Sequence, residues 1–335
     1  MSSSTSSFKT ELKVVLLVAL LLLACEAAVR LVEPRLSLDI QHIRQLPAVA
    51  RRLAGRDEAA GAGEAADGVA QRVLFIGNSQ LRVGIDPEVI ERALNAREEG
   101  PVRVARVHPD GTALPDWYYA FKHYFVDARL PPDVLVVCFA DNHLQDAHPV
   151  SPVRLARYFS APGDIPEIFG LDLPGFDARA EYLVASASAS FANRERVRTR
   201  VLDLLIPGYR DGAQRINSGV KRTEGGSARP APGYERLKRL LALARAQNVS
   251  VVLLAMPQPE VYELDEGLLR TAREAGAPLV DCRRVEGVGR QSFADEMHLS
   301  SAGAQAYSLR LGRLLADVLP PPRKEALPAS AQSRR

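Results

Sequence analysis

Val73-Leu74-Phe75-Ile76-Gly77-Asn78-Ser79 is the stretch of the chain that decides the fold. Four consecutive apolar residues followed by a glycine are typical of a strand buried on both faces that ends in a tight turn. The next segment, 87–97, begins with proline and has apolar residues at helical spacing, which predicts a helix. Together they predict a strand–turn–helix unit with Ser79 exposed at the turn.

The same alternation recurs along the chain. Strand patterns lie at 102–107, 134–139, 249–255 and 278–282, and helical patterns at 114–128, 182–205, 234–247, 264–275 and 301–318. Apolar strands alternating with amphipathic helices indicate an α/β domain with a mainly parallel sheet covered on both faces. We expect this domain over 71–319, with a helical and loop insertion at about 146–232, a juxtamembrane helix and linker at 33–70, and an unstructured tail at 320–335.

Composition limits the class of protein. The 335 residues include 43 Lys and Arg against 40 Asp and Glu, and the net charge of +3 gives no reason to expect nucleic acid as a partner. Three cysteines, Cys25, Cys138 and Cys282, lack Cys-x-x-Cys spacing, which excludes a disulfide scaffold and a structural zinc site. Cys138 and Cys282 fall in predicted strands, so we expect them to be buried apolar residues rather than a redox pair.

The N-terminal part predicts a membrane anchor. The apolar run that starts at Val14 is too short to cross about 30 Å of hydrocarbon, but 14–32 provides 19 positions. Lys9 and Lys13 precede it, which favours a cytoplasmic segment 1–13 and a single-pass protein of the inner membrane with a periplasmic body. A cleaved secretory peptide, a lipoprotein signal at Cys25 and a buried core helix are the alternatives.

Polar residues that can perform chemistry follow the predicted strands. Ser79 follows the first strand, Gly111 the second and Asn142 the third, and the carboxyl ends of parallel strands share one edge of a sheet. Asp295 and His298 lie just before the last helix, at a spacing that lets the carboxylate accept a hydrogen bond from the ring. A serine at a turn, an asparagine in a loop and an exposed Asp-x-x-His are each common as structural features alone.

Two further clusters are more typical of structure than of chemistry. Asp141, His143, Asp146 and His148 match no metal-ligand spacing, so we expect ordinary loop polarity and neither metal nor cofactor. The aromatic residues in 117–121 offer a surface for stacking on a sugar, but such a helical stripe more often belongs to the core.

The order of these motifs resembles that of the SGNH hydrolases, also called the GDSL esterase/lipase superfamily. The resemblance implies a flavodoxin-like three-layer α/β/α sandwich. It implies that Ser79 is the nucleophile, that His298 is the base and that Asp295 orients it. The backbone of Ser79, Gly111 and the amide of Asn142 would form the oxyanion hole.

The chain departs from the family pattern at two blocks. Gly-Asp-Ser-Leu appears as Gly77-Asn78-Ser79-Gln80, and Gly-x-Asn-Asp appears as 140–143, which ends in His143. The anchor and the insertion are similar to a membrane-anchored bacterial branch that includes alginate O-acetylation proteins.

The resemblance leaves three functions to compare. The first is a serine esterase or deacylase acting on an acyl ester or an acetylated carbohydrate. The second is an O-acyltransferase that modifies a cell-surface polysaccharide with a membrane-bound acyl-donor partner. The third is a non-catalytic scaffold on the same fold, since a fold alone does not define a function.

Overall fold

The computed structural model describes residues 4–56, 70–97, 100–146, 148–209, 212 and 232–321. Its contacts divide the chain into two compact units. The first contains Met1–Arg44 and Ser151–Pro230, and we name it the anchor unit after the membrane anchor expected from the sequence. The second, the sheet unit, contains Gln45–Val150 and Ala231–Arg335. Most of the predicted linker, the end of the predicted insertion and most of the predicted tail lie outside the described residues.

The sheet unit is built on five parallel strands in the order β2-β1-β3-β4-β5. This is the flavodoxin-like order, in which the chain reverses direction across the sheet after β2 and creates a switch point between β1 and β3. The predicted α/β fold with a parallel sheet is confirmed. The strands are β1 (Gln71–Ile76), β2 (Val102–Val107), β3 (Val134–Phe139), β4 (Ser250–Ala255) and β5 (Leu279–Asp281).

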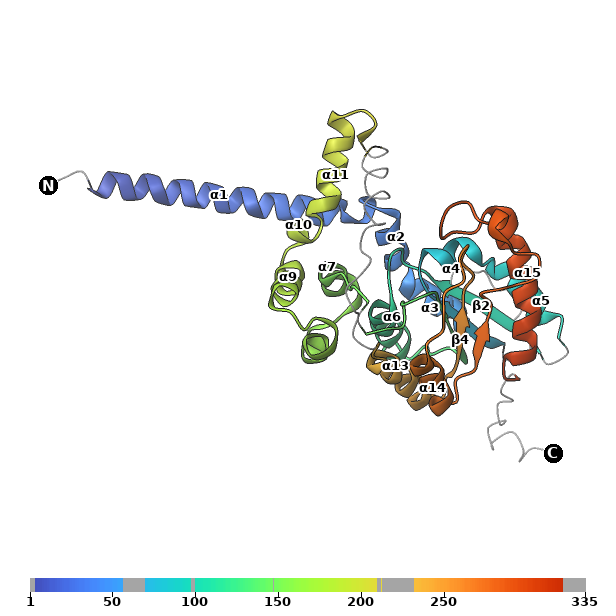
Figure 1. Cartoon of the computed structure of the whole chain (residues 1–335). Coiled ribbons are helices and arrows are strands. Elements are labelled where there is room, and N and C mark those ends of the chain that lie inside the picture. Colours follow the sequence, from blue (N-terminus) through green and yellow to red (C-terminus); the bar gives the residue numbers. More distant parts are fainter. Residues whose placement is uncertain are drawn as a thin grey trace, which may run out of the picture. The chain divides into compact units, whose positions relative to one another are not determined.

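Helices cover both faces of this sheet, as Figure 1 shows. On one face α15 packs against α4 and α5, and on the other α13 packs against α6 and α14. The helices of this unit are α3 (Leu46–Leu53), α4 (Ser79–Gly84), α5 (Pro87–Asn95), α6 (Leu114–Phe121), the π-helical turn η2 (Lys122–Val126), α13 (Glu235–Ala246), α14 (Glu266–Ala275), the 3₁₀ turn η6 (Arg290–Ser292) and α15 (Ser301–Val318).

The central strands are apolar on both faces because both faces are covered. All six residues of β3 are buried. Val73, Phe75 and Val136 belong to one core cluster with Ile90 of α5 and Leu311 of α15. Successive side chains of a strand point to opposite faces, so the residues between them supply the second core. This explains the unbroken hydrophobic runs in the sequence.

Several sequence expectations concern this core. Trp117, Tyr119 and Phe121 of α6 are fully buried, so the aromatic stripe belongs to the core and offers no surface for a sugar. Cys138 and Cys282 are free thiols that are likewise buried, and burial raises the pKa of both.

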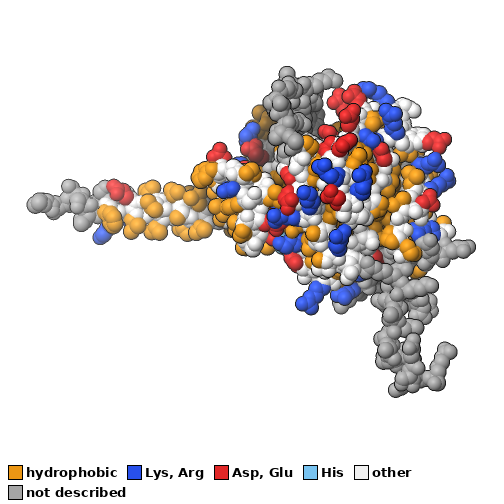
Figure 2. All heavy atoms as spheres, turned by 60° about the horizontal axis from the view of Figure 1, so that its bottom comes forward, with side chains coloured by type: hydrophobic (Ala, Val, Ile, Leu, Met, Phe, Trp, Pro, Cys, Tyr) orange, Lys and Arg blue, Asp and Glu red, His pale blue; other side chains and the backbone are white. Residues whose placement is uncertain are grey.

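The anchor unit contains a long N-terminal helix and a group of short helices. Helix α1 (Ser4–Val32) includes a span, Phe8–Arg35, that is long and apolar enough to cross a membrane. Its apolar side chains are exposed along its length, as Figure 2 shows in orange. The other described elements are η1 (Glu33–Arg35), α2 (Leu38–Arg44), α7 (Pro152–Arg154), η3 (Leu155–Phe159), η4 (Pro162–Asp164), α8 (Ile165–Glu167), η5 (Ile168–Asp172), α9 (Phe176–Ala187), α10 (Ala189–Ala192) and α11 (Arg194–Leu205).

Candidate active site

The turn after β1 places Ser79 at the carboxyl edge of the sheet. A Cβ on Gly77 would lie 3.0 Å from the Cys138 carbonyl oxygen and 3.0 Å from the Leu81 Cβ, so a larger residue would have to displace β3 or α4. The Asn78 side chain accepts a hydrogen bond from the Gln80 N–H at 3.0 Å and thereby caps α4. Helix α4 therefore begins at Ser79, whose backbone N–H has no acceptor within the helix.

The histidine comes from a loop that is tied to the first turn of α15. The Ser292 carbonyl accepts hydrogen bonds from the Ser300 N–H at 2.8 Å and the Ser300 hydroxyl at 3.0 Å. A Cβ on Gly303 would lie only 2.1 Å from that carbonyl oxygen, so this close approach requires glycine. Within the loop, the Ala294 N–H donates to the His298 carbonyl at 2.8 Å. The loop is therefore a constrained hairpin, which holds the Asp295 and His298 side chains close to each other.

The structure brings the three predicted catalytic residues together. The Ser79 Oγ lies 2.9 Å from the His298 Nε2, although the two residues are 219 positions apart. The His298 Nδ1 lies 2.9 Å and 3.1 Å from the two carboxylate oxygens of Asp295. With Nδ1 donating to the carboxylate, Nε2 is left as the acceptor for the serine proton.

Asp295 is held as a carboxylate. Burial by itself would raise the pKa of this group, but hydrogen bonds from the His298 ring and from the N–H groups of Met297 and His298 lower the pKa below its usual value. The Asp295 side chain is 58% exposed and that of His298 23% exposed, so solvent reaches this pair.

The loops that carry the predicted oxyanion residues are joined through Asn78. Its amide nitrogen donates to the Thr112 carbonyl at 3.3 Å, next to Gly111, and lies 3.4 Å from both ring nitrogens of His143, next to Asn142. Gly111 has a φ of +63°, a conformation that favours glycine. Asn142 is half-buried, and its carbonyl accepts from the Gln145 N–H at 3.0 Å. Among the described residues, no hydrogen bond connects the Asn142 amide with Ser79. The role of Asn142 in the oxyanion hole therefore remains a prediction.

His143, which departs from the family pattern, supports this loop as a neutral ring. Its Nδ1 accepts from the Ala140 N–H at 3.2 Å, which requires an unprotonated Nδ1. Burial, with a smaller contribution from His148, lowers the pKa of His143 to about 4. The ring also contacts Trp117 edge-on at 6.1 Å between centroids. Asn78 and His143 therefore act as a helix cap and a neutral acceptor, where the pattern of the SGNH hydrolases that the sequence resembles has aspartates. The position of Ser79 does not depend on charge at either residue.

Two arginines that the sequence reasoning did not identify stabilise the nucleophile turn. Arg82, one helical turn after Ser79, pairs with both carboxylate oxygens of Asp110 at 2.9 Å and 3.2 Å. Arg106 of β2 donates to the carbonyls of Arg82 and Ile85 at the end of α4. The Arg82–Asp110 ion pair thus joins α4, which begins at Ser79, to the loop that contains Gly111. The i, i+3 spacing of Ser79 and Arg82 was the available signal, but it does not specify the partner.

Gln80 is the second feature that the sequence reasoning missed. Its side chain is 5% exposed, and neither Nε2 nor Oε1 has a hydrogen-bond partner among the described residues. A buried amide without partners reduces stability by about 1–3 kcal/mol. The Gly-Asp-Ser-Leu block of the SGNH hydrolases has leucine at this position. A glutamine in place of leucine was therefore the sequence signal for an unusual buried amide.

The acidic and histidine residues after β3 have individual structural roles. The Asp146 carboxylate accepts from the N–H groups of Glu235 and Arg236 at 2.8 Å and 2.9 Å, at the start of α13. The His148 Nδ1 lies 3.0 Å from the Pro149 carbonyl, and Asp141 adopts a positive φ of 49°. Among the described residues no group of three or more His, Cys, Asp or Glu is arranged to hold a metal ion.

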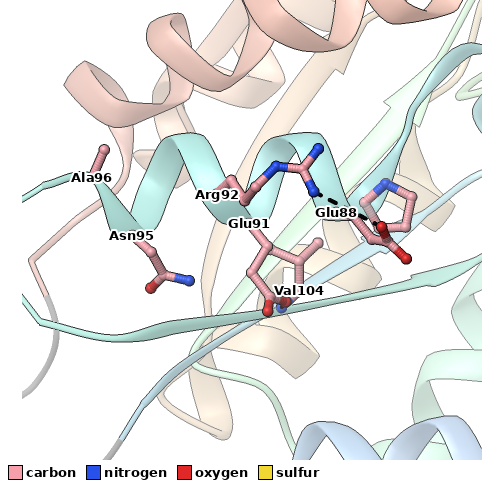
Figure 3. Close-up of a pocket in the computed structure, with 7 residues that line it drawn as sticks. Glu88, Glu91, Arg92, Asn95, Ala96 and Val104 are labelled. Atoms are coloured by element: carbon pink, nitrogen blue, oxygen red, sulfur yellow. Dashed lines mark hydrogen bonds and ion pairs between the residues drawn. The ribbon is translucent and has the colours of Figure 1, made fainter.

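A surface hollow of about 520 Å³ lies beside α5 and the edge strand β2, with the Glu88–Arg92 ion pair on its rim (Figure 3). There the Glu91 carboxylate accepts from the Val104 N–H at 2.8 Å. The side chains of this hollow therefore satisfy the exposed edge of the sheet, a structural role that limits pairing with other chains.

Comparisons with known proteins find similar solved structures only. No protein-family model and no curated protein sequence matches the chain. A lipase/acylhydrolase from Enterococcus faecalis is 12% identical with a TM-score of 0.39, over 75% of this chain and 98% of that one. The acetylxylan esterase Axe2 from Geobacillus stearothermophilus is 15% identical with a TM-score of 0.38, over 77% and 99%. At this level of likeness, the argument for a function rests on the geometry of the site in this chain.

Proposed function

We propose that the chain is a serine esterase or deacylase of the SGNH type, which cleaves an ester or O-acetyl group through an acyl-enzyme. The observation that carries the proposal is the 2.9 Å separation between the Ser79 Oγ and the His298 Nε2, with Asp295 on the opposite ring nitrogen. A nucleophile, its base and an orienting group within hydrogen-bond reach are what acyl transfer requires.

The reaction proceeds in two halves. The Ser79 Oγ attacks the carbonyl carbon while His298 takes the hydroxyl proton, and the Asp295 carboxylate stabilises the imidazolium that forms. The tetrahedral intermediate collapses, and His298 gives its proton to the departing alcohol. A water molecule then loses a proton to His298 and attacks the carbonyl carbon of the acyl-enzyme. His298 returns this proton to the Ser79 Oγ as the carboxylic acid leaves.

The oxyanion of each intermediate needs hydrogen-bond donors in fixed positions. We propose that the backbone N–H groups of Ser79 and Gly111 and the side-chain amide of Asn142 supply them. Such donors accelerate acyl transfer because they are oriented before charge develops. The Arg82–Asp110 pair supports this arrangement, since it connects the serine helix to the Gly111 loop.

Exposure of the site favours hydrolysis over transfer to a sugar. The carboxylate that orients the base is more than half exposed, whereas an acyl-enzyme reserved for another acceptor must exclude water. A non-catalytic scaffold does not require a serine hydrogen-bonded to an imidazole that is itself hydrogen-bonded to a carboxylate. Hydrolysis is therefore the function that the geometry supports best.

We also propose that α1 remains as an uncleaved anchor, with the sheet unit outside the cytoplasm. Helix α1 continues without a break past Cys25, and Glu26 and Arg30 are hydrogen-bonded to 187–190. The N-terminal segment is thus part of the folded anchor unit. Mass spectrometry of the intact membrane-bound protein tests this. A mass that includes the residues before Cys25 would support the uncleaved anchor, whereas a chain that begins at a lipidated Cys25 would refute it.

A serine-directed fluorophosphonate tests the enzyme proposal on the full-length protein. We expect labelling of the wild type and none of Ser79→Ala, because only an activated hydroxyl reacts. Absent labelling, or equal labelling of both proteins, would refute the enzyme. Incubation of an acetyl ester with and without oligosaccharide acceptors then separates the two reactions, and acetylated oligosaccharide as the main product would favour transfer.

A further inference from the structure

The insertion is attached directly to the N-terminal helix within the anchor unit. The Glu26 carboxylate accepts hydrogen bonds from the Ser188 hydroxyl at 2.9 Å and from the N–H groups of Ala189 and Ser190 at 2.7 Å and 2.9 Å. Arg30 donates to the same carboxylate at 2.7 Å. An acidic residue in an apolar helix is costly unless it is paired, and here the start of α10 satisfies it.

A second carboxylate repeats this attachment. Glu33, 2% exposed, accepts from Arg157 at 3.0 Å through two nitrogens, from the Tyr158 hydroxyl at 3.0 Å and from the Asn193 amide at 2.9 Å. Asn193 lies between α10 and α11, so both ends of α10 are bound to the N-terminal segment. The segment around α10 is therefore held at a fixed level along α1.

That level coincides with one end of the membrane span. A helix rises about 1.5 Å per residue, so 14–32 is about 28 Å long, close to the thickness of the hydrocarbon core. Glu26 and Glu33 lie in and just beyond the last two turns of this span. If α1 crosses the membrane, α10 and the segments joined to it lie at the lipid–water boundary of the outer leaflet.

The segments on both sides of α10 expose apolar side chains at this level. We name Leu183–Ile206, which covers the end of α9, all of α10 and all of α11, the collar. Leu204 is 85% exposed and Leu205 71% exposed, and other apolar side chains of the collar are exposed by 46–49% (Leu183, Val184, Val201 and Ile206). Leu31 of α1 is 80% exposed. An apolar surface of this kind marks an interaction site. Here it belongs to a segment that is hydrogen-bonded to the end of the apolar span of α1.

Charge on α11 fits a phospholipid headgroup region. The first seven residues of this helix contain four arginines and one glutamate (Arg194, Arg196, Arg198 and Arg200, with Glu195), and its last five residues are apolar apart from Asp203. Figure 1 shows α11 running across the direction of α1, so an α1 that crosses the bilayer leaves α11 along its surface. Arginines beside exposed leucines are the composition of helices that lie in a membrane interface and favour anionic lipids.

From these observations we propose that the collar is a second membrane-binding surface, which seats the insertion in the outer leaflet and contacts anionic phospholipid. The proposal rests on the anchoring role of α1 but not on catalysis by Ser79. Lipid is the occupant because the collar is hydrogen-bonded to Glu26 and Glu33, at the end of the apolar span of α1.

Tryptophan quenching in vesicles tests this on the full-length protein. The native Trp117 is fully buried, so a tryptophan added at an exposed site reports its own surroundings. Leu204→Trp, Leu20→Trp and Leu309→Trp place the probe in the collar, in the membrane span and on α15 of the sheet unit. Each protein is reconstituted in phosphatidylcholine and phosphatidylglycerol with brominated acyl chains, and the wild-type emission is subtracted.

We expect the Leu204→Trp emission to fall by about half or more, because an interfacial helix lies about 5–10 Å deep at the acyl boundary. Leu20→Trp should be quenched further and Leu309→Trp unchanged. Quenching at position 20 without quenching at 204 overturns the collar, since its apolar face then meets water or protein. No quenching at position 20 overturns the anchor and the collar together, while serine labelling remains unaffected. If Leu204→Trp is quenched equally in vesicles with and without phosphatidylglycerol, the preference for anionic lipid is overturned.

Discussion

Protonation of His143 is the perturbation whose size follows most directly from the structure. The ring is neutral because its Nδ1 accepts the Ala140 N–H, and burial lowers its pKa from 6.5 to about 4. A pKa that is lower in the folded state means that the unfolded chain binds the proton more readily. The neutral ring therefore contributes its full stability above pH 6.5, and this contribution is lost as the pH falls from 6.5 to about 4.

The magnitude follows from the shift. Each pKa unit corresponds to about 1.36 kcal/mol, so the shift of His143 is worth about 3 kcal/mol of unfolding free energy at most. Other groups titrate in the same range, so the contribution of His143 is measured as a difference. His143→Asn keeps an oxygen that can accept the Ala140 N–H but cannot be protonated. Between pH 7 and pH 4 the wild type should lose up to about 3 kcal/mol more stability in urea than this variant.

The chain contains its own probe of this ring. Trp117 is the single tryptophan, and its ring contacts His143 edge-on at 6.1 Å. A charged imidazolium quenches indole fluorescence, so Trp117 emission should fall with a midpoint near pH 4 and without the red shift of unfolding. His148→Asn is the matched control and should move the midpoint slightly upward, because His148 contributes to the lowered pKa. A midpoint near 6.5, or the same titration in His143→Asn, would refute the assignment of a neutral buried ring.

The remaining predictions concern the nucleophile and its supports. His298→Ala should reduce kcat at least as much as Asp295→Ala, because the imidazole transfers the proton while the carboxylate only orients it, and steady-state rates on an acetyl ester compare them. Asn142→Ala should lower kcat by about 10²-fold or more if its amide faces the oxyanion, and an unchanged kcat would assign it to the turn. Arg82→Ala should reduce kcat about tenfold with little change in melting temperature, since a half-exposed ion pair contributes about 0–1 kcal/mol to stability, and a melting temperature that falls with kcat would show general unfolding instead. Gln80→Leu should raise the unfolding free energy by about 1–3 kcal/mol because it removes a buried amide that has no partner among the described residues, and a destabilised variant would mean that this amide is satisfied.

The sequence alone contained the information for the sheet. The run that became β3 is apolar throughout, and β1 and β4 are apolar from Val73 and Val251 onward. Only a sheet covered on both faces buries such consecutive apolar residues. The order of polar residues at the strand ends also followed from the sequence, because parallel strands present their carboxyl ends at one edge. Asp295 and His298 are local partners, and their spacing was enough to predict the hydrogen bond between them.

Contacts between residues that are far apart in the sequence could not be predicted from the sequence alone. The approach of His298 to Ser79 depends on a close contact between Gly303 and Ser292, which no pattern of hydrophobicity indicates. The partner of Arg82 could not be chosen among the many acidic residues, since ion pairs follow from proximity rather than from spacing.

For this chain, local periodicity determined the elements, their order and the identity of the residues at the strand ends. Tertiary structure decided which of these residues meet and what surrounds them. Only the folded chain shows that Asn78 caps a helix, that His143 is neutral, and that Glu26 of α1 binds the start of α10. The physical reason is that backbone hydrogen bonding and hydrophobic burial depend on neighbours along the chain, whereas desolvation, hydrogen-bond partners and proton affinity depend on neighbours in space.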